Sequence, residues 1–300
     1  KYNNYDYLLK TNSLGLASPE VQPGEPDENT IRILVIGDAF SMPEGLEYEK
    51  AYPALLEQKL NTELDGKKVE VINAGVTGYG PVELIPQLKP DIVIYQFFVN
   101  EFNEAHYEPE QRLKSIGLVS RHNSFRKRML ETSQVKAHFE RMKRRVLELV
   151  SGEPSPYRYW KSLLQFYETG GNGLYEEDKL KVLHDSLHRM QGVCKDNGAK
   201  MVVFYVPGAV EVSKPEQIAY YPWDRDIYDR SKFDPERPLR NLQKLASQVG
   251  LSVFDLTRAL KNHPDQPVYF PRSWHWNAKG HEVASEAIAN DLLQRGIGQQ

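Results

Sequence analysis

Apolar residues follow two different periods along this chain, and the changes of period predict its elements. The run IRILVIGDAFS, residues 31–41, is mainly apolar up to Gly-Asp. A short apolar run that a glycine turn closes is typical of a buried strand. Apolar residues then recur at helical spacing, so we expect a helix over residues 49–64.

The same alternation continues to the end of the chain. We expect further strands over 69–73, 91–98, 201–206 and 251–256, and helices over 180–194, 239–249 and 277–295. Strands that alternate with helices are typical of a parallel sheet covered on both faces. The predicted fold is therefore a three-layer α/β/α sandwich with a parallel sheet of about five strands.

Two segments interrupt this pattern. Residues 1–30 are polar and proline-rich and predict either an extended arm on the domain or a disordered linker, whereas residues 31–300 form the domain. Residues 102–171 hold no strand-like run, and their apolar residues recur at helical spacing, so we expect a helical insertion there. Its polar face is basic, with Arg126, Lys127, Arg128, Lys136, Arg141, Lys143, Arg144 and Arg145. This face either contacts lipid headgroups or an anionic polymer, or is simply solvated.

Composition narrows the classes of function. The net charge of −3 over 300 residues argues against general nucleic-acid binding. The single cysteine, Cys194, excludes an internal disulfide framework. The chain holds no apolar run of about 18 residues, the length that predicts a membrane-spanning helix. It starts at Lys1 with no visible signal peptide, so we expect that any anchor lies upstream.

Residues that acyl transfer requires stand in four loops. Asp38, Ala39 and Ser41 follow the first expected strand, and glycines at 75, 78 and 80 follow the second. Asn100, a donor for an oxyanion, follows the third, and His275, a base, precedes the last helix. Such loops meet at one edge of a parallel sheet, where ligands bind.

These loops also carry the resemblance to a family. GDAFS, VINAGVTGYG, IYQFFVNEFNE and YFPRSWHWNAKGH resemble, in order, the four blocks of the SGNH/GDSL hydrolases. The resemblance extends from about Asn12 to Arg295, and its flanking text is typical of bacterial members. It implies a flavodoxin-like sandwich, an oxyanion hole at Gly78 and Asn100, a catalytic His275 and no cofactor or metal.

Two positions depart from the family pattern. Ala39 stands where the family has its nucleophilic serine, and Ser273 stands where related sequences have the aspartate that orients the histidine. Ala39 is consistent with an engineered inactive variant or with a natural pseudoenzyme. Ser41 is a weak candidate for a substitute nucleophile. Asp38 and two tryptophans, Trp274 and Trp276, are assigned to substrate binding, although both tryptophans could instead pack the loop.

The resemblance implies a serine-dependent acyl or acetyl esterase that acts on a carbohydrate or lipid ester and that Ala39 inactivates here. A non-catalytic protein that binds a glycan or lipid, and an O-acyltransferase, are the alternatives. The resemblance further implies an extracytoplasmic or envelope-associated bacterial protein. His184 and His188 have metal-ligand spacing, but no third ligand adjoins them. The sequence leaves the oligomeric state open.

Overall fold

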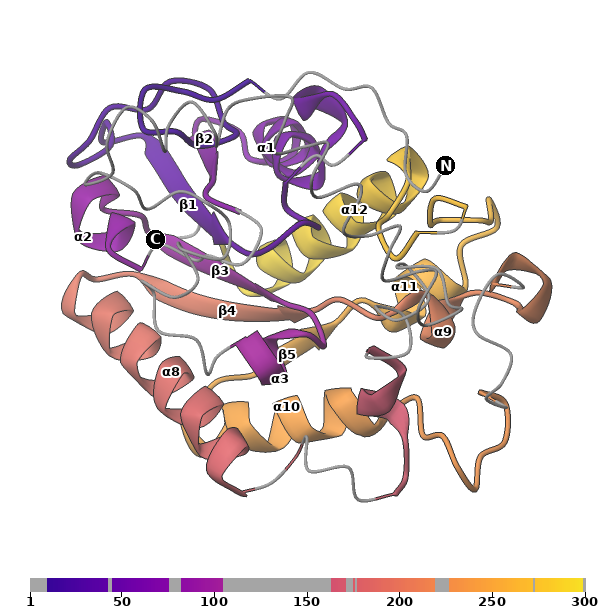
Figure 1. Cartoon of the computed structure of the whole chain (residues 1–300). Coiled ribbons are helices and arrows are strands. Elements are labelled where there is room, and N and C mark those ends of the chain that lie inside the picture. The colour runs from indigo at the N-terminus through magenta and orange to yellow at the C-terminus, as the bar shows by residue number, and fades with distance from the viewer. Residues whose placement is uncertain are drawn as a thin grey trace, which may run out of the picture.

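The computed structural model describes residues 10–42, 45–75, 82–104, 163–170, 175, 177–218, 227–271 and 273–298. In this part of the chain, five strands form one sheet in the order β2-β1-β3-β4-β5, and all neighbours are parallel (Figure 1). The predicted parallel sheet is therefore confirmed. The strand order reverses between β1 and β3, which makes their carboxyl ends the topological switch point where such sheets bind ligands.

The strands keep close to their predicted bounds. They are β1 (Thr30–Ile36), β2 (Lys68–Asn73), β3 (Ile92–Phe97), β4 (Lys200–Tyr205) and β5 (Val253–Asp255). All six residues of β3 are buried, because this central strand is covered on both faces. The sheet therefore gives a rigid support to the loops that follow its strands.

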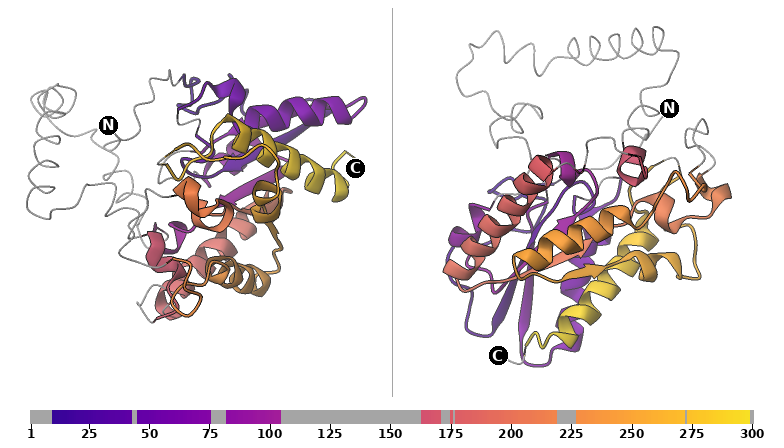
Figure 2. Two further views of the ribbon diagram at one scale, coloured as in Figure 1. Left: turned by 90° about the vertical axis from the view of Figure 1, so that its right-hand side faces the viewer. Right: turned by 90° about the horizontal axis from the view of Figure 1, so that it is seen from below.

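Helices cover both faces of the sheet. They are α1 (Tyr52–Glu63), α2 (Leu84–Leu88), α3 (Glu101–Glu104), α8 (Glu177–Asp196), α9 (Ala209–Val212), α10 (Arg237–Gln248), α11 (Thr257–Lys261) and α12 (Ala278–Gln294). Figure 1 shows α1 and α12 together above the sheet and α8 and α10 beneath it. From below, α8 and α10 lie side by side (Figure 2). The three-layer sandwich is thus confirmed.

Two predictions about elements need correction. The helix expected from residue 49 begins at Tyr52, because Ala51 is extended and Pro53 occupies the first turn, where a missing N–H costs nothing. A separate 3-10 turn, Tyr48–Lys50, precedes it. Between β4 and α10, where we expected neither a helix nor a strand, the chain forms α9 and a 3-10 turn, Pro215–Ile218. Such short helices show too few turns to give a periodic signal.

The segment before β1 packs on the core from residue 10 onward. Leu16, Ala17 and Val21 are buried. The buried Arg32 side chain donates to the carbonyls of Gly24 at 2.6 Å and Leu88 at 2.5 Å. Division of the chain at residue 30 stays a prediction. The expected insertion lies almost entirely outside the described residues.

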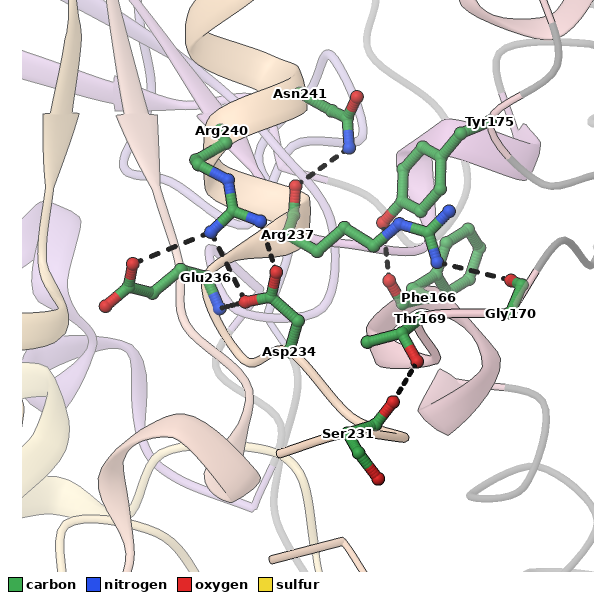
Figure 3. A network of polar contacts seen from close by, with 10 residues as sticks. All are labelled: Phe166, Thr169, Gly170, Tyr175, Ser231, Asp234, Glu236, Arg237, Arg240 and Asn241. Atoms are coloured by element: carbon green, nitrogen blue, oxygen red, sulfur yellow. Dashed lines mark hydrogen bonds and ion pairs between the residues drawn. The ribbon is translucent and has the colours of Figure 1, made fainter. Parts of the chain in front are cut away.

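The described residues between Phe166 and Tyr175 are held against α10 (Figure 3). The Arg237 guanidinium lies 4.7 Å above the ring of Tyr175 and donates to the Gly170 carbonyl. The Tyr175 hydroxyl donates to the Phe166 carbonyl at 2.8 Å. Asp234, which precedes α10, forms an ion pair with Arg240 on that helix. These contacts hold residues 166–170 and Tyr175 against α10.

Candidate active site

Three loops meet at the carboxyl edge of the sheet through their aromatic side chains. Phe40, which follows β1, lies 4.8 Å from Phe98 after β3 and 5.3 Å from the ring of His275 before α12. Phe98 also lies 6.0 Å from Trp274. These centroid distances are typical of attractive aromatic pairs. The structure therefore brings the loops of Ala39, Asn100 and His275 together at the topological switch point.

Ala39 occupies the exposed corner of the first of these loops. It is partly exposed, while its neighbours Asp38 and Phe40 are buried at 5% and 1% exposure. A side chain at position 39 can therefore contact a ligand, whereas the side chains of Asp38 and Phe40 are covered by the protein. Its methyl group has no proton to transfer and no lone pair to attack an acyl carbon.

Beneath this corner lies a buried polar network. Asp38 Oδ1 accepts from Gln96 Nε2 at 2.7 Å and from the Phe40 N–H at 3.0 Å. Burial raises the pKa of Asp38, and the hydrogen bond from Gln96 opposes this rise. These bonds fix the turn that presents residue 39. The substrate-binding role assigned to Asp38 stays a prediction, and its burial leaves little surface for a ligand.

Ser41 belongs to the same network. It is fully buried, and its Oγ donates to Gln96 Oε1 at 2.5 Å and lies 2.9 Å from the Tyr52 hydroxyl. Its carbonyl accepts from Asn73 Nδ2 at 2.7 Å. A Cβ at Gly75 would lie only 2.3 Å from the Cβ of Ser41. This placement keeps Ser41 away from ligands and gives it a structural role.

Sequence reasoning missed most of this network. Gln96 lies one residue before the end of β3, Asn73 is the last residue of β2, and both are buried at 2% or less. A polar amide in or at the end of a predicted buried strand was the signal that the sequence offered, because a buried amide must find hydrogen-bond partners within the protein. The partners themselves come from separate strands, so the sequence does not reveal them.

His275 stands at the edge of the site and is partly exposed. Its backbone N–H donates to Ser273 Oγ at 3.1 Å, and its carbonyl accepts from the Phe270 N–H at 3.0 Å. Ser273, at 2% exposure, thus holds the backbone of the loop. An orienting action of Ser273 on the imidazole stays a prediction.

The two tryptophans that flank His275 are both buried, at 3% for Trp274 and 0% for Trp276. Trp276 packs against Phe40 at 5.0 Å and Tyr52 at 6.1 Å. Between the two roles that the sequence left open, this position gives Trp276 a packing role. Substrate binding by Trp274 stays a prediction.

The remaining predicted residues divide into two groups. Asn100 is partly exposed between β3 and α3, at the same edge as His275. Gly78 and Gly80 lie outside the described residues. Within the described ranges, no three metal-ligating side chains cluster. His184 and His188 stack on each other along α8, with ring centroids 6.4 Å apart, and His184 Nδ1 lies 3.1 Å from Asp185 Oδ1.

His281 fastens α12 behind the site. Its Nδ1 accepts from the Tyr52 N–H at 3.2 Å, so the ring must be neutral. Burial, with a smaller contribution from the charge of His275, lowers the pKa of His281 from 6.5 to about 3. Between these values the unfolded chain binds a proton that the folded state does not.

We therefore expect the free energy of unfolding to fall as the pH drops from 6.5 towards 3. His281→Asn keeps an acceptor but cannot titrate, so its stability should fall less over this range. Urea unfolding at several pH values measures the difference, and His188→Asn on the exposed face of α8 is the control. Equal acid sensitivity of His281→Asn and the parent would contradict the prediction.

A second buried ionisable group, Glu211 on α9, lies beside the histidine loop. Its carboxyl accepts from the Gly208 N–H at 2.6 Å and the Tyr167 hydroxyl at 2.8 Å. A Cβ at Gly208 would lie 2.7 Å from the Trp274 ring, so the turn that Glu211 holds also supports that ring. Burial raises the pKa of Glu211 from 4.5 to about 8.

Between pH 4.5 and 8 the folded state keeps a proton on Glu211 that the unfolded chain has lost. We expect this to lower the free energy of unfolding as the pH rises, by up to about 1.4 kcal/mol per pH unit. Glu211→Gln should remove this contribution, whereas Glu216→Gln, on the surface, should not. Urea unfolding at pH 5 and 8 decides, and a mutational effect that is the same at both pH values would refute the assignment.

The comparisons with known proteins agree with this architecture. The sequence profile of the family ALGX, described as "SGNH hydrolase-like domain, acetyltransferase AlgX", matches residues 175–300. No curated protein sequence matches the chain. The matched part of the chain, residues 175–300, is therefore similar to an SGNH hydrolase-like domain, in line with the resemblance seen in the sequence blocks.

Solved structures of esterases are similar to this chain at low identity. EstA, a psychrotrophic esterase from Pseudoalteromonas sp., is 14% identical with a TM-score of 0.42, over 89% of this chain and 98% of its own. A catalytic mutant of Axe2, an acetylxylan esterase from Geobacillus stearothermophilus, is 13% identical with a TM-score of 0.44, over 87% and 94%. A carbohydrate acetylesterase family member from Sinorhizobium meliloti is 10% identical with a TM-score of 0.43, over 88% and 98%. At these values the likenesses carry no argument about fold or activity.

Proposed function

We propose that this chain has the site of a serine-type acyl esterase with alanine in place of the nucleophile. One observation carries the proposal. Ala39 is partly exposed just after β1. Its neighbour Phe40 packs against Phe98, in the loop of Asn100, and against the ring of His275. A nucleophile, a base and an oxyanion donor would all stand at this edge if residue 39 carried a hydroxyl.

The proposed reaction of such a serine proceeds in two steps. The hydroxyl oxygen at position 39 attacks the acyl carbon while His275 removes its proton, and the same histidine returns the proton to the leaving alcohol. Asn100, Gly78 and the N–H of residue 39 would stabilise the oxyanion. Water, activated by His275, then releases the acid. All groups come from the chain, so the proposal includes no metal or cofactor.

A covalent probe tests the proposal directly. Ala39→Ser should react with a fluorophosphonate once per chain, and peptide mass spectrometry should place the label at position 39. The present chain should stay unlabelled, because Ser41 is fully buried and bonded to Gln96. A label on Ser41, or no label on a folded Ala39→Ser protein, would overturn the proposal.

A second candidate function is acyl transfer to an alcohol rather than to water. The match to a family described by an acetyltransferase favours it. The two reactions share the acyl-enzyme and differ only in the acceptor. Ala39→Ser with an acetyl ester and added oligosaccharides distinguishes them: acetylated sugar indicates transfer, and acetate alone indicates hydrolysis.

A third candidate is a non-catalytic protein that holds a glycan or lipid ester at the same edge of the sheet. The intact Asp38–Gln96–Ser41 network favours this candidate, because the loop stays ordered although position 39 has no hydroxyl. Calorimetric titration of the present chain with acetylated oligosaccharides tests it. Tight binding together with an inactive Ala39→Ser protein would favour this candidate over the esterase.

Cellular placement also belongs to the proposal. We propose an extracytoplasmic or envelope-associated protein that acts on a small-molecule, carbohydrate or lipid ester. No helix in the described ranges is long and apolar enough to cross a membrane. The basic helices proposed for contact with a membrane surface lie outside the described residues.

A further inference from the structure

The opposite edge of the sheet carries a cavity of about 560 Å³. It is bounded by the starts of three strands, at Ile31, Ile92 and Lys200, and by the ends of α8 and α12 on the two faces of the sheet. The two helical layers extend to this edge where the sheet between them begins, and small residues such as Ala199 and Gly250 leave the space open. This volume is in the usual range of small-molecule sites.

The floor of the cavity is apolar. It is made by Ile31, Ile92, Val202, Leu251, Leu292 and Ile297. Four of these side chains are otherwise buried, at 8% exposure or less, so the cavity opens onto core surface. Apolar surface of this kind gains free energy when a hydrocarbon chain displaces water from it.

The rim of the cavity carries charged side chains of both signs, with basic side chains in the majority. Lys67, Lys195, Lys200 and Arg295 stand against two carboxylates, Glu28 and Asp91. Asp91 Oδ2 already accepts from the Arg32 N–H at 2.7 Å, and Arg295 pairs with Asp291 at 2.5 Å. Among the described residues, the three lysines form no ion pair. Asp291 offsets Arg295, and the two carboxylates and the negative C-terminal ends of α8 and α12 offset the lysine charges overall. The feature that points to an anion is therefore the set of three lysine ammonium groups without an ion pair within the described ranges, and not a net charge.

We propose that this cavity binds a single-chain anionic amphiphile of the fatty-acid class. The hydrocarbon tail lies on the apolar floor, and the carboxylate lies at the rim beside Lys195 and Lys200. An uncharged chain would leave the rim charges without a partner, and a small anion would leave the floor wet. The combination therefore fits a carboxylate with a medium-length tail better than either part alone. This site lies at the far edge from Ala39 and does not depend on the proposed function.

Calorimetric titration of the whole chain with dodecanoate, below its micellar concentration, tests the proposal. Dodecanol and acetate serve as ligands that carry only the tail or only the charge. We expect one dodecanoate per chain, bound at least about tenfold more tightly than dodecanol, and no detectable binding of acetate. Absence of dodecanoate binding, or equal affinity for dodecanol, would overturn the proposal.

Variants locate the site. Lys195→Gln with Lys200→Gln should weaken dodecanoate binding at least about tenfold and leave dodecanol binding unchanged, while Lys214→Gln, an exposed lysine outside the cavity, should have no effect. Ala199→Phe should fill the cavity and abolish binding of both. If that variant does not fold, Ile297→Glu places a carboxylate on the floor instead. Unchanged binding in the double lysine variant, or in either floor variant, would place the ligand elsewhere and refute the site.

Discussion

Placing a hydroxyl at position 39, by Ala39→Ser, is expected to convert the chain into an esterase. The change adds one oxygen at the partly exposed corner beside buried Asp38 and Phe40, so the loop should keep its conformation. Loss of the nucleophile in serine hydrolases removes the whole covalent route, and the reverse change should raise the rate by about 10³-fold or more. Release of nitrophenol from nitrophenyl acetate, and of acetate from acetylated sugars, measures it.

The controls for this result separate chemistry from folding. Ala39→Gly also alters the corner but adds no nucleophile, so it should stay as inactive as the parent. Adding His275→Ala to Ala39→Ser should remove the activity again, because the base is lost. Activity that survives without His275, or a folded Ala39→Ser protein with no activity on any ester, would argue against the esterase and direct attention to ligand binding.

Placing a carboxylate at position 273 is expected to increase the activity of the Ala39→Ser protein further. Ser273 is buried at 2% exposure and lies two residues from His275, and its Oγ accepts from the backbone N–H of that histidine. A carboxylate there can also accept from the imidazole, fix its tautomer and stabilise its charged form. We expect Ser273→Asp, together with Ala39→Ser, to raise kcat at least about tenfold. The ceiling is about 10⁴-fold, the effect of the corresponding acid in serine proteases.

Ser273→Asn in the same background is the matched control. It has nearly the same shape and can accept the backbone N–H, but it carries no charge. It should leave kcat near that of the Ala39→Ser protein. An equal gain from Asp and Asn would show that size rather than charge matters at this position. No gain from a folded Asp variant would mean that another group already orients His275.

Local patterns in the sequence were enough to predict the sandwich and the order of its loops. Strand and helix periods are local properties, so the five parallel strands could be predicted within one or two residues at most ends. Rules of α/β topology then placed the loops of Ala39, Asn100 and His275 at one edge. Even α12 could be predicted, since its N-cap Asn277 and its apolar stripe both lie within the segment.

The contacts of each side chain near that edge depend instead on how the elements pack. The Tyr52 N–H and His281 are 229 positions apart, and Ser41 meets Gln96 across 55 positions. Bonds of this kind join separate elements, so no local pattern specifies them. The same holds for the charged cavity at the opposite edge, whose lining comes from three strands and two helices. A sequence records which residues are apolar or charged, but packing decides which of them face one another.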